Sequence, residues 1–466
     1  MEQAASSATC VAQTSSGSVR GVRGGVNVFR GIPYAEPPVG DLRWQPPRPH
    51  RGWLGIRDAL TFGPDCVQTP HAHLRGQGMS EDCLYLNVWT AAQDEGERRP
   101  VMVWIHGDGY TRGSGSHAIY DGAALARAGV VVVTINYRLG LLGFLAHPSL
   151  SAESAHASSG NYGLLDQIEA LRWVRRNIAA FGGDSSRVTI FGQSAGGSCS
   201  HLLMASPLSE GLFAQAILHS PGAMRPMATL TEAEQAGARI GTDVKKMRAL
   251  SAEQLLEMTS LLVPPMRKLA SPRGLGPIVD GWVVEGDDVA NYRMGRVRAM
   301  PLMTGIAVNE GKRLAERFGL KTVAALDAYL SDSFGSIETL PRSYRAQVDA
   351  EVGPALERVI GDTQFSYGTW RVAQSMQKLG APVFQYVLAR PNDNSSSPPT
   401  HDDELPYVFG TLDKGGLRFV AEPGIPPSKE ALSLSALMMG AWVRFAKAGN
   451  PNGGTLPHWP TLGQAE

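Results

Sequence analysis

The chain has 466 residues, and its 43 Lys plus Arg balance 43 Asp plus Glu, so the formal net charge is zero at pH 7. A neutral chain has no long-range field to attract nucleic acid or an anionic membrane. No run of about 18 apolar residues occurs, which argues against a membrane span. We therefore expect a globular protein that acts on a small, largely neutral molecule.

The amino-terminal residues and the number of cysteines indicate the cellular compartment. The first residues, MEQAASSATCVAQTSSG, lack the basic start and the apolar stretch of a secretory signal, so a cytoplasmic location is predicted. Four cysteines (Cys10, Cys66, Cys83 and Cys199) are too few to form a disulfide framework in a chain of this length.

Strands and helices alternate along the chain. Short apolar runs typical of strands buried on both faces occur at 101–105, 129–135, 188–191, 301–308 and 383–389. Helical spacing of apolar residues marks 163–183 and 434–445, and Ser251 with Gln254 predicts a capping box. This alternation predicts an α/β protein with a mostly parallel central sheet flanked by helices on both faces.

The segment 187–206, RVTIFGQSAGGSCSHLLMAS, contains a strand pattern, the sequence G-x-S-x-G and a helical pattern rich in small residues. Glycines allow a sharp strand-to-helix turn that exposes the Ser194 hydroxyl, and the N–H of Ala195 then lies at a helix amino terminus. A structural glycine turn is the alternative, but the flanking strand and helix favour a nucleophilic serine.

A serine nucleophile needs a histidine base and an acid that orients the base. In α/β-hydrolases the acid follows the serine along the chain, and the histidine follows the acid. Of the histidines after Ser194, His401 lies on a long polar loop after the last predicted strand, whereas His458 lies between Pro457 and Trp459 and is expected to be a packed structural residue. Glu310 and Asp280 both compete for the acid, and spacing favours Glu310 only modestly.

Several segments together resemble the type-B carboxylesterases, the α/β-hydrolase family that includes bacterial p-nitrobenzyl esterases, liver carboxylesterases and cholinesterases. The motifs occur in the family order over most of the chain: FRGIPYAEPPVGDLRWQPP (29–47), SEDCLYLNVW (80–89), INYRLGLLGFL (135–145), GNYGLLDQIEALRWVRRNIAAFGGD (160–184), FGQSAGG (191–197), PIVDG (277–281), NEG (309–311) and HDDELPYVFG (401–410).

The resemblance implies a catalytic triad, with Ser194 as nucleophile, His401 as base and Glu310 as acid, and assigns Asp280 to a structural turn. It also implies an oxyanion hole formed by the backbone N–H groups of Asp108, Gly109 and Ala195. Buried polar residues behind the triad would be Gln193, Ser220 and Glu404. No metal or organic cofactor is implied.

Two positions depart from the family pattern. Gln193 replaces the glutamate that many relatives have before the nucleophile. Asp108 replaces a glycine, and an ionised carboxylate in the oxyanion hole would oppose the developing negative charge. Its side chain is therefore expected to turn toward the substrate cleft, to be protonated by burial, or to pair with a cation such as Arg112.

The resemblance implies hydrolysis of a carboxylic ester through a covalent acyl-enzyme, within one domain (1–466) whose helical insertions around 223–276 and 312–380 shape the pocket. The partner is a small ester, with no nucleic acid or membrane involved, and the sequence does not indicate an oligomeric state. Alternatives are a specialised acyl transfer, a thioester, lactone or cyclase-type activity on the same scaffold, or a non-catalytic binding protein.

Overall fold

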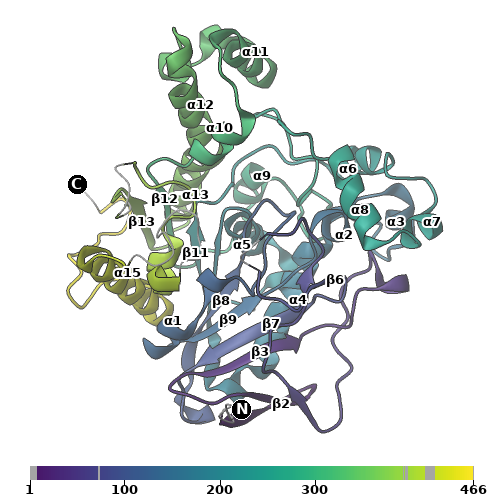
Figure 1. Ribbon diagram of the computed structural model, residues 1–466, viewed down its shortest axis with the longest axis vertical. Coiled ribbons are helices and arrows are strands. Elements are labelled where there is room, and N and C mark those ends of the chain that lie inside the picture. The colour runs from purple at the N-terminus through teal and green to yellow at the C-terminus, as the bar shows by residue number, and fades with distance from the viewer. Residues whose placement is uncertain (1–7, 72–73, 392, 394–396, 415–425, 465–466) are drawn as a thin grey trace, which may run out of the picture.

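A sheet of eleven strands forms the centre of the protein in the computed structural model, which describes residues 8–71, 74–391, 393, 397–414 and 426–464 (Figure 1). Each predicted apolar run forms a strand, and an additional strand lies among them. The parallel part of the sheet contains, in spatial order, β9 (Val131–Ile135), β8 (Arg99–Ile105), β10 (Gly183–Gln193), β11 (Gln215–His219), β12 (Leu302–Ala307) and β13 (Val383–Leu388).

The amino-terminal part of the sheet is antiparallel and was not predicted from the apolar runs. The antiparallel strands are β1 (Thr9–Thr14), β2 (Gly17–Val22), β3 (Asn27–Pro33) and β7 (Tyr85–Thr90), the last of which joins β9. Short β4 (Ile56–Asp58) pairs with β2 in parallel, and β5 (Asp65–Cys66) and β6 (Met79–Ser80) form a separate parallel pair. Exposed and buried residues alternate along β1, as expected where one face meets solvent.

Helices cover both faces of the parallel strands, which confirms the predicted architecture. One face of β8, with Val101 and Val103, shares a core with helices α4 (Tyr162–Asn177), α5 (Ala195–Ala205) and α13 (Tyr367–Lys378). The other face, with Met102 and Trp104, packs with α1 (Ala123–Arg127), α14 (Leu405–Phe409) and α15 (Lys429–Ala448). The helices predicted at 163–183 and 434–445 are α4 and α15.

Further helices lie away from the sheet. Two short ones, α2 (Gly140–Phe144) and α3 (Pro148–Glu153), precede α4, and a second group contains α6 (Leu230–Gly237), α7 (Val244–Arg248), α8 (Ala252–Met258) and α9 (Asp288–Arg293). The predicted capping box of Ser251 and Gln254 begins α8. Helices α10 (Lys312–Phe318), α11 (Val323–Phe334) and α12 (Val352–Gly361) share a separate apolar core and rise above the sheet in Figure 1. None of the helices formed by the described residues combines the length and apolar character that crossing a bilayer requires.

Candidate active site

Ser194 lies at the sharp turn between β10 and α5. Its backbone angles, φ 56 and ψ −120, are a strained combination for a residue with a side chain. The Ser194 N–H donates to the carbonyl of His219 at 2.9 Å, which ties the turn to the end of β11. A Cβ atom on Gly196 would lie 2.0 Å from the carbonyl oxygen of Ile105, so only glycine lets α5 begin this close to β8. The turn has the strand-to-helix geometry predicted for a nucleophile.

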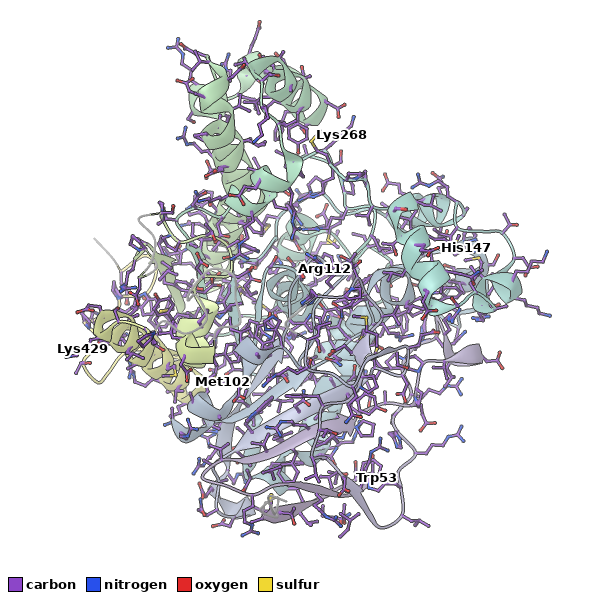
Figure 2. All side chains as sticks on the ribbon, in the orientation of Figure 1. Trp53, Met102, Arg112, His147, Lys268 and Lys429 are labelled. Carbon is purple, nitrogen blue, oxygen red and sulfur yellow. The ribbon has the colours of Figure 1, made fainter. Side chains whose placement is uncertain are left out.

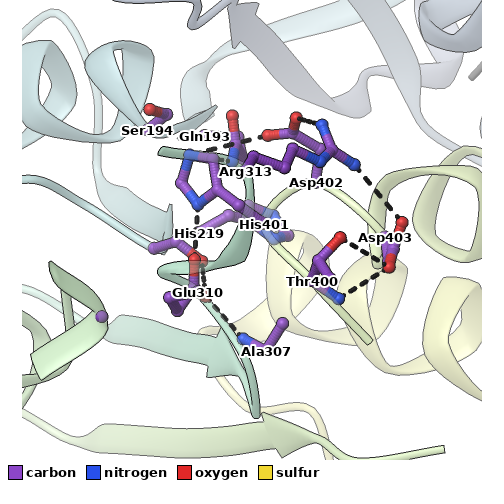
Figure 3. Close-up of polar contacts among 12 residues, drawn as sticks. Gln193, Ser194, His219, Ala307, Glu310, Arg313, Thr400, His401, Asp402 and Asp403 are labelled. Atoms are coloured by element: carbon purple, nitrogen blue, oxygen red, sulfur yellow. Dashed lines mark hydrogen bonds and ion pairs between the residues drawn. The ribbon is translucent and has the colours of Figure 1, made fainter. Parts of the chain in front are cut away.

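The carboxylate of Glu310 holds the imidazole of His401 (Figure 3). Glu310 follows β12 and His401 precedes α14, and the distance from His401 Nδ1 to Glu310 Oε2 is 2.5 Å. The other carboxylate oxygen of Glu310 accepts hydrogen bonds from Ser220 Oγ and the Ala307 N–H, both at 2.6 Å. Because Glu310 is 2% exposed and fully hydrogen-bonded, it fixes both the orientation and the tautomer of His401.

The other candidates for acid and base lie elsewhere. Asp280 Oδ1 accepts the N–H groups of Trp282, Val283 and Val284 and so closes a turn. His458 is exposed, so the expectation that its position between proline and tryptophan packs it into the core is wrong.

Gln193 contacts the catalytic face of the imidazole. Its side-chain nitrogen lies 2.9 Å from His401 Nε2, the atom that must accept the serine proton in the predicted mechanism. Among the described residues no hydrogen bond joins the Ser194 hydroxyl to His401. When the imidazole is neutral, the amide therefore occupies its lone pair in the absence of substrate, and catalytic hydrogen bonds commonly form only in the substrate complex.

Asp402 is a neighbour of the imidazole that the sequence analysis did not single out. Its Oδ1 lies 3.6 Å from His401 Nε2, and Arg313 pairs with its other oxygen. Burial tends to lower the pKa of His401, but the negative charges of Asp402 and Glu310 outweigh it and raise the pKa to about 9. Asp402 has a φ of 81, and this left-handed backbone is not visible in the sequence. The only signal was its position beside His401.

Glu404 lies near His401 and Glu310, with neither carboxylate oxygen hydrogen-bonded in the described structure. His219 Nδ1, 3.6 Å away, is occupied by Tyr386 Oη at 2.8 Å, and His219 Nε2 accepts from Trp442 Nε1. Burial, reinforced by the charges of Glu310 and Asp402, raises the pKa of Glu404 to about 8. Glu404 is therefore a neutral acid at pH 7, in line with the cost of burying an unpaired charge.

The glycine-rich loop after β8 lies against the nucleophile turn. A Cβ atom on Gly107 would lie 3.2 Å from Ser194 Cβ, and the next three residues all have left-handed φ angles: Asp108 (72), Gly109 (70) and Tyr110 (67). The loop is held in place by a hydrogen bond from the Gly140 N–H to the Tyr110 carbonyl at 2.8 Å. Successive backbone N–H groups in such a turn are able to bind an anion.

The Asp108 side chain is half-exposed and forms an ion pair with Arg112, with 2.9 Å between Oδ1 and Nη2. Arg112 lies near the middle of the molecule, above the end of the parallel strands in the view of Figure 2. Of the three arrangements considered for this carboxylate, the structure shows pairing with a cation.

Phe365 covers the imidazole of His401, with 4.3 Å between the ring centroids. It lies in a π-helical turn, Asp362–Ser366, that joins α12 to α13. Such wide turns often occur at functional sites.

Comparisons with known proteins give the family. A family model described as "Carboxylesterase family" matches residues 8–466. The chain belongs to the carboxylesterase family. It is 45% identical to the fumonisin B1 esterase of Sphingopyxis macrogoltabida, over 97% of this chain and 84% of that protein. It is 36% identical to the para-nitrobenzyl esterase of Bacillus subtilis (strain 168), over 97% of this chain and 92% of that one.

Solved structures agree with this assignment. A PNB esterase structure superposes with a TM-score of 0.82 at 32% identity, covering 97% of this chain and 93% of that chain. A carboxylesterase of Geobacillus stearothermophilus gives the same TM-score at 35% identity and the same coverage. The fold is thus the α/β-hydrolase fold, and the protein is a carboxylesterase that hydrolyses carboxylic esters of small molecules.

The buried acid Glu404 should make stability depend on pH. Since its pKa is raised from 4.5 to about 8, the folded state retains a proton that the unfolded state loses, and stability falls between these pH values. Replacing Glu404 by Gln removes this loss, which amounts to at most about 1.4 kcal/mol per pH unit. Urea unfolding at pH 5, 6.5 and 8 should show that the free energy of unfolding of the variant increases relative to that of the native protein as pH rises. The exposed Glu430→Gln is the control and should show no such increase. A difference between Glu404→Gln and the native protein that does not change with pH, or that equals the difference for Glu430→Gln, contradicts the assignment.

Proposed function

We propose that Ser194, His401 and Glu310 form the catalytic triad of this esterase. The observation that carries the proposal is their convergence: a strained serine at the end of β10 whose neighbour Gln193 lies 2.9 Å from the imidazole of His401, and a buried carboxylate that holds this imidazole at 2.5 Å. These residues lie far apart in the sequence, and structural roles alone do not require them to meet.

The N–H groups of Asp108, Gly109 and Ala195 are proposed to form the oxyanion hole. The contact between Gly107 and Ser194 supports the placement of the loop, and the left-handed angles of Asp108 and Gly109 support the direction of its N–H groups. Ala195 is the first residue of α5, so its N–H has no partner within the helix. Removing one such donor typically costs a factor of about a hundred to a thousand in kcat.

The proposed reaction proceeds through an acyl-enzyme. Ser194 Oγ attacks the ester carbonyl while His401 Nε2 accepts its proton, and the three N–H groups stabilise the tetrahedral oxyanion. His401 then protonates the departing alcohol. A water molecule, deprotonated by the same imidazole, releases the carboxylic acid. Glu310 stabilises the imidazolium at each step.

Gln193 must release His401 Nε2 before the proton can move. Its amide donates to a neutral imidazole, and after rotation by half a turn its oxygen accepts a hydrogen bond from an imidazolium. The side chain can therefore accompany His401 through both protonation states.

The walls of the substrate pocket and the cellular location are also part of the proposed function. The helices within 223–276 and 312–380 are proposed to shape the substrate pocket, which residues from both segments line or support. A cytoplasmic location is also proposed, since four cysteines in 466 residues do not make the disulfide framework typical of small secreted proteins.

Covalent labelling tests the nucleophile. A fluorophosphonate probe should label the native protein, and Ser194→Ala should abolish both labelling and hydrolysis of benzyl levulinate, a neutral ester. Ser200→Ala is the matched control, because Ser200 lies on the same helix with its hydroxyl bonded to the Gly196 carbonyl. Fumonisin B1, the compound in the name of a relative, is a second substrate to test. Labelling that survives in Ser194→Ala refutes the proposed nucleophile.

The pH dependence of kcat/KM should reflect the raised pKa of His401. Only the neutral imidazole can accept the serine proton, so activity should rise with pH, with a midpoint above the ordinary 6.5 and toward about 9. Asp402→Asn removes a nearby negative charge and should move the midpoint to lower pH, whereas exposed Asp41→Asn should not. A midpoint at or below 6.5, or one unaffected by Asp402→Asn, contradicts this electrostatic role.

The Asp108–Arg112 pair should protect the oxyanion hole. Arg112→Gln leaves the carboxylate uncompensated beside the developing oxyanion and should lower kcat about fivefold, because a partly exposed ion pair is worth about 1 kcal/mol. In an Asp108→Asn background the same replacement should have little effect, because no charge remains to be neutralised. Equal losses in the two backgrounds mean that Arg112 acts independently of Asp108.

A further inference from the structure

A cleft with an excess of positive charge lies beside the nucleophile turn. Its lining includes Tyr110, Ser198, Gly222, Arg225, Arg273 and Asp288. Ser198 is one helical turn after Ser194, and its hydroxyl donates to the Ser194 carbonyl at 3.1 Å. Tyr110 belongs to the proposed oxyanion loop. The cleft therefore begins about 5.4 Å, the pitch of a helix, from the reacting serine.

Two arginines in this cleft have donors without protein partners. Arg273 stacks over the Tyr110 ring at 5.3 Å, with its buried Nε unpartnered in the described structure. Its Nη1 lies 4.0 Å from where a Cβ atom on Gly109 would be, so the guanidinium reaches the oxyanion loop. Arg225 donates through Nε to the Gly222 carbonyl and through Nη1 to Gln364 Oε1 at 2.5 Å. No hydrogen bond from Arg225 Nη2 is found among the described residues.

A third arginine stands behind them. Arg267 donates to the same Gln364 oxygen, so one neutral amide joins two guanidinium groups. Among the described residues, none of the three arginines forms an ion pair with a carboxylate. Burial, and then repulsion from the neighbouring arginines, lowers the pKa of Arg225, and the same causes lower that of Arg267 to about 9. The cluster is therefore costly to hold without an anion.

The single carboxylate in the lining has partners of its own. Asp288 accepts a hydrogen bond from the Met224 N–H at 2.5 Å and lies 3.3 Å from His201 Nδ1. Burial tends to raise the pKa of Asp288, but His201, the Met224 N–H and the charge of Arg225 outweigh burial and lower it, so the carboxylate is ionised. Its Oδ2 is bonded to Met224, whereas its Oδ1 makes no hydrogen bond in the described structure. Asp288 thus offsets part of the positive charge of the cleft without pairing with an arginine.

We propose that Arg225 and Arg273, supported by Arg267, bind a carboxylate on the acyl part of the substrate, so that the enzyme prefers hemiesters of dicarboxylic acids. The proposal rests on the proposed catalytic function of Ser194. A carboxylate two or three methylene groups from the scissile carbonyl spans roughly the one helical turn that separates Ser194 from the cleft. Planar guanidinium groups bind carboxylates with paired, charge-assisted hydrogen bonds. This local charge departs from the neutral substrate expected from the net charge of the chain.

The position of the base assigns the cleft to the acyl side. His401 must protonate the departing alcohol, so the alcohol lies next to the imidazole. The described contacts of His401 are with Gln193, Glu310, Phe365 and Asp402, and none of these residues lines the cleft. The acyl chain is the part of the ester that extends away from the base.

A pair of nearly isosteric esters tests this preference. Benzyl hydrogen succinate carries a free carboxylate, and benzyl levulinate has a methyl ketone in its place. We expect the native enzyme to favour the succinate in kcat/KM by about ten- to a hundredfold, the range typical of hydrogen bonds to charged groups. Arg225→Gln and Arg273→Gln should each bring the ratio close to one, chiefly through KM for the succinate. Arg175→Gln, on α4 with its guanidinium bonded to the Gly211 carbonyl, is the matched control and should keep the ratio.

The outcomes separate the two proposals. Hydrolysis of neither ester contradicts the proposed function, whereas equal hydrolysis of both, or a ratio unchanged in both cleft variants, overturns the anion site alone. If the variants do not fold, inhibition of the native enzyme tests the site. Free succinate should inhibit hydrolysis of benzyl levulinate competitively, whereas succinamide should not, and equal inhibition by the two compounds overturns the site.

A second pair of esters tests the acyl placement. The butyrate ester of 4-(hydroxymethyl)benzoic acid carries a carboxylate on the alcohol side, and the matching methyl benzoate is neutral. The native enzyme should not prefer the charged member of this pair, and a preference for charge that is confined to this pair overturns the acyl placement.

Discussion

The close approach of backbone to backbone at the start of α5 is the constraint on which the site depends. A Cβ atom on Gly192 would lie 2.5 Å from the backbone of Gly196, one on Gly196 2.0 Å from the Ile105 carbonyl, and one on Gly107 2.5 Å from the Gln193 carbonyl. These contacts press the nucleophile turn, the end of β8 and the glycine-rich loop into one rigid body. The position of Ser194 relative to its proposed oxyanion donors is therefore set by the sheet rather than by flexible side chains.

Negative and positive groups occupy separate regions around the site, although the chain as a whole is neutral. Three carboxyl groups, Glu310, Asp402 and Glu404, surround the imidazole, and each is handled differently: one is bonded to His401, one is paired with Arg313, and one is held as a neutral acid. Three guanidinium groups lie in and behind the neighbouring cleft. Net charge describes long-range attraction and does not predict such local separation.

The sequence predicted the parallel strands other than β11, and the strand-to-helix turn, because buried runs and glycine spacing are local signals. Motif order selected His401 and Glu310, which the structure brings together. The antiparallel strands β1 and β2 were missed, since half-buried alternation is a weaker signal than an apolar run, and β3 and β7 were missed because polar residues interrupt their apolar runs. Asp402 was missed because its proximity to the imidazole depends on a φ of 81. The arginine cluster was missed because its members come from separate segments that meet in the fold, Arg225 and Arg267 at Gln364 and Arg273 at Tyr110.

The π-helical turn at Asp362–Ser366 sets a limit on how this enzyme can diversify. Consecutive residues of that turn serve two neighbours, since Gln364 holds Arg225 and Arg267 while Phe365 covers His401. An insertion or deletion there rotates both side chains at once. Under the proposed function, changes in substrate range that leave the chemistry intact are therefore more accessible to evolution in the segment around Arg273 than in the wide turn, where the proposed recognition of the substrate and the placement of the proposed base are inherited together.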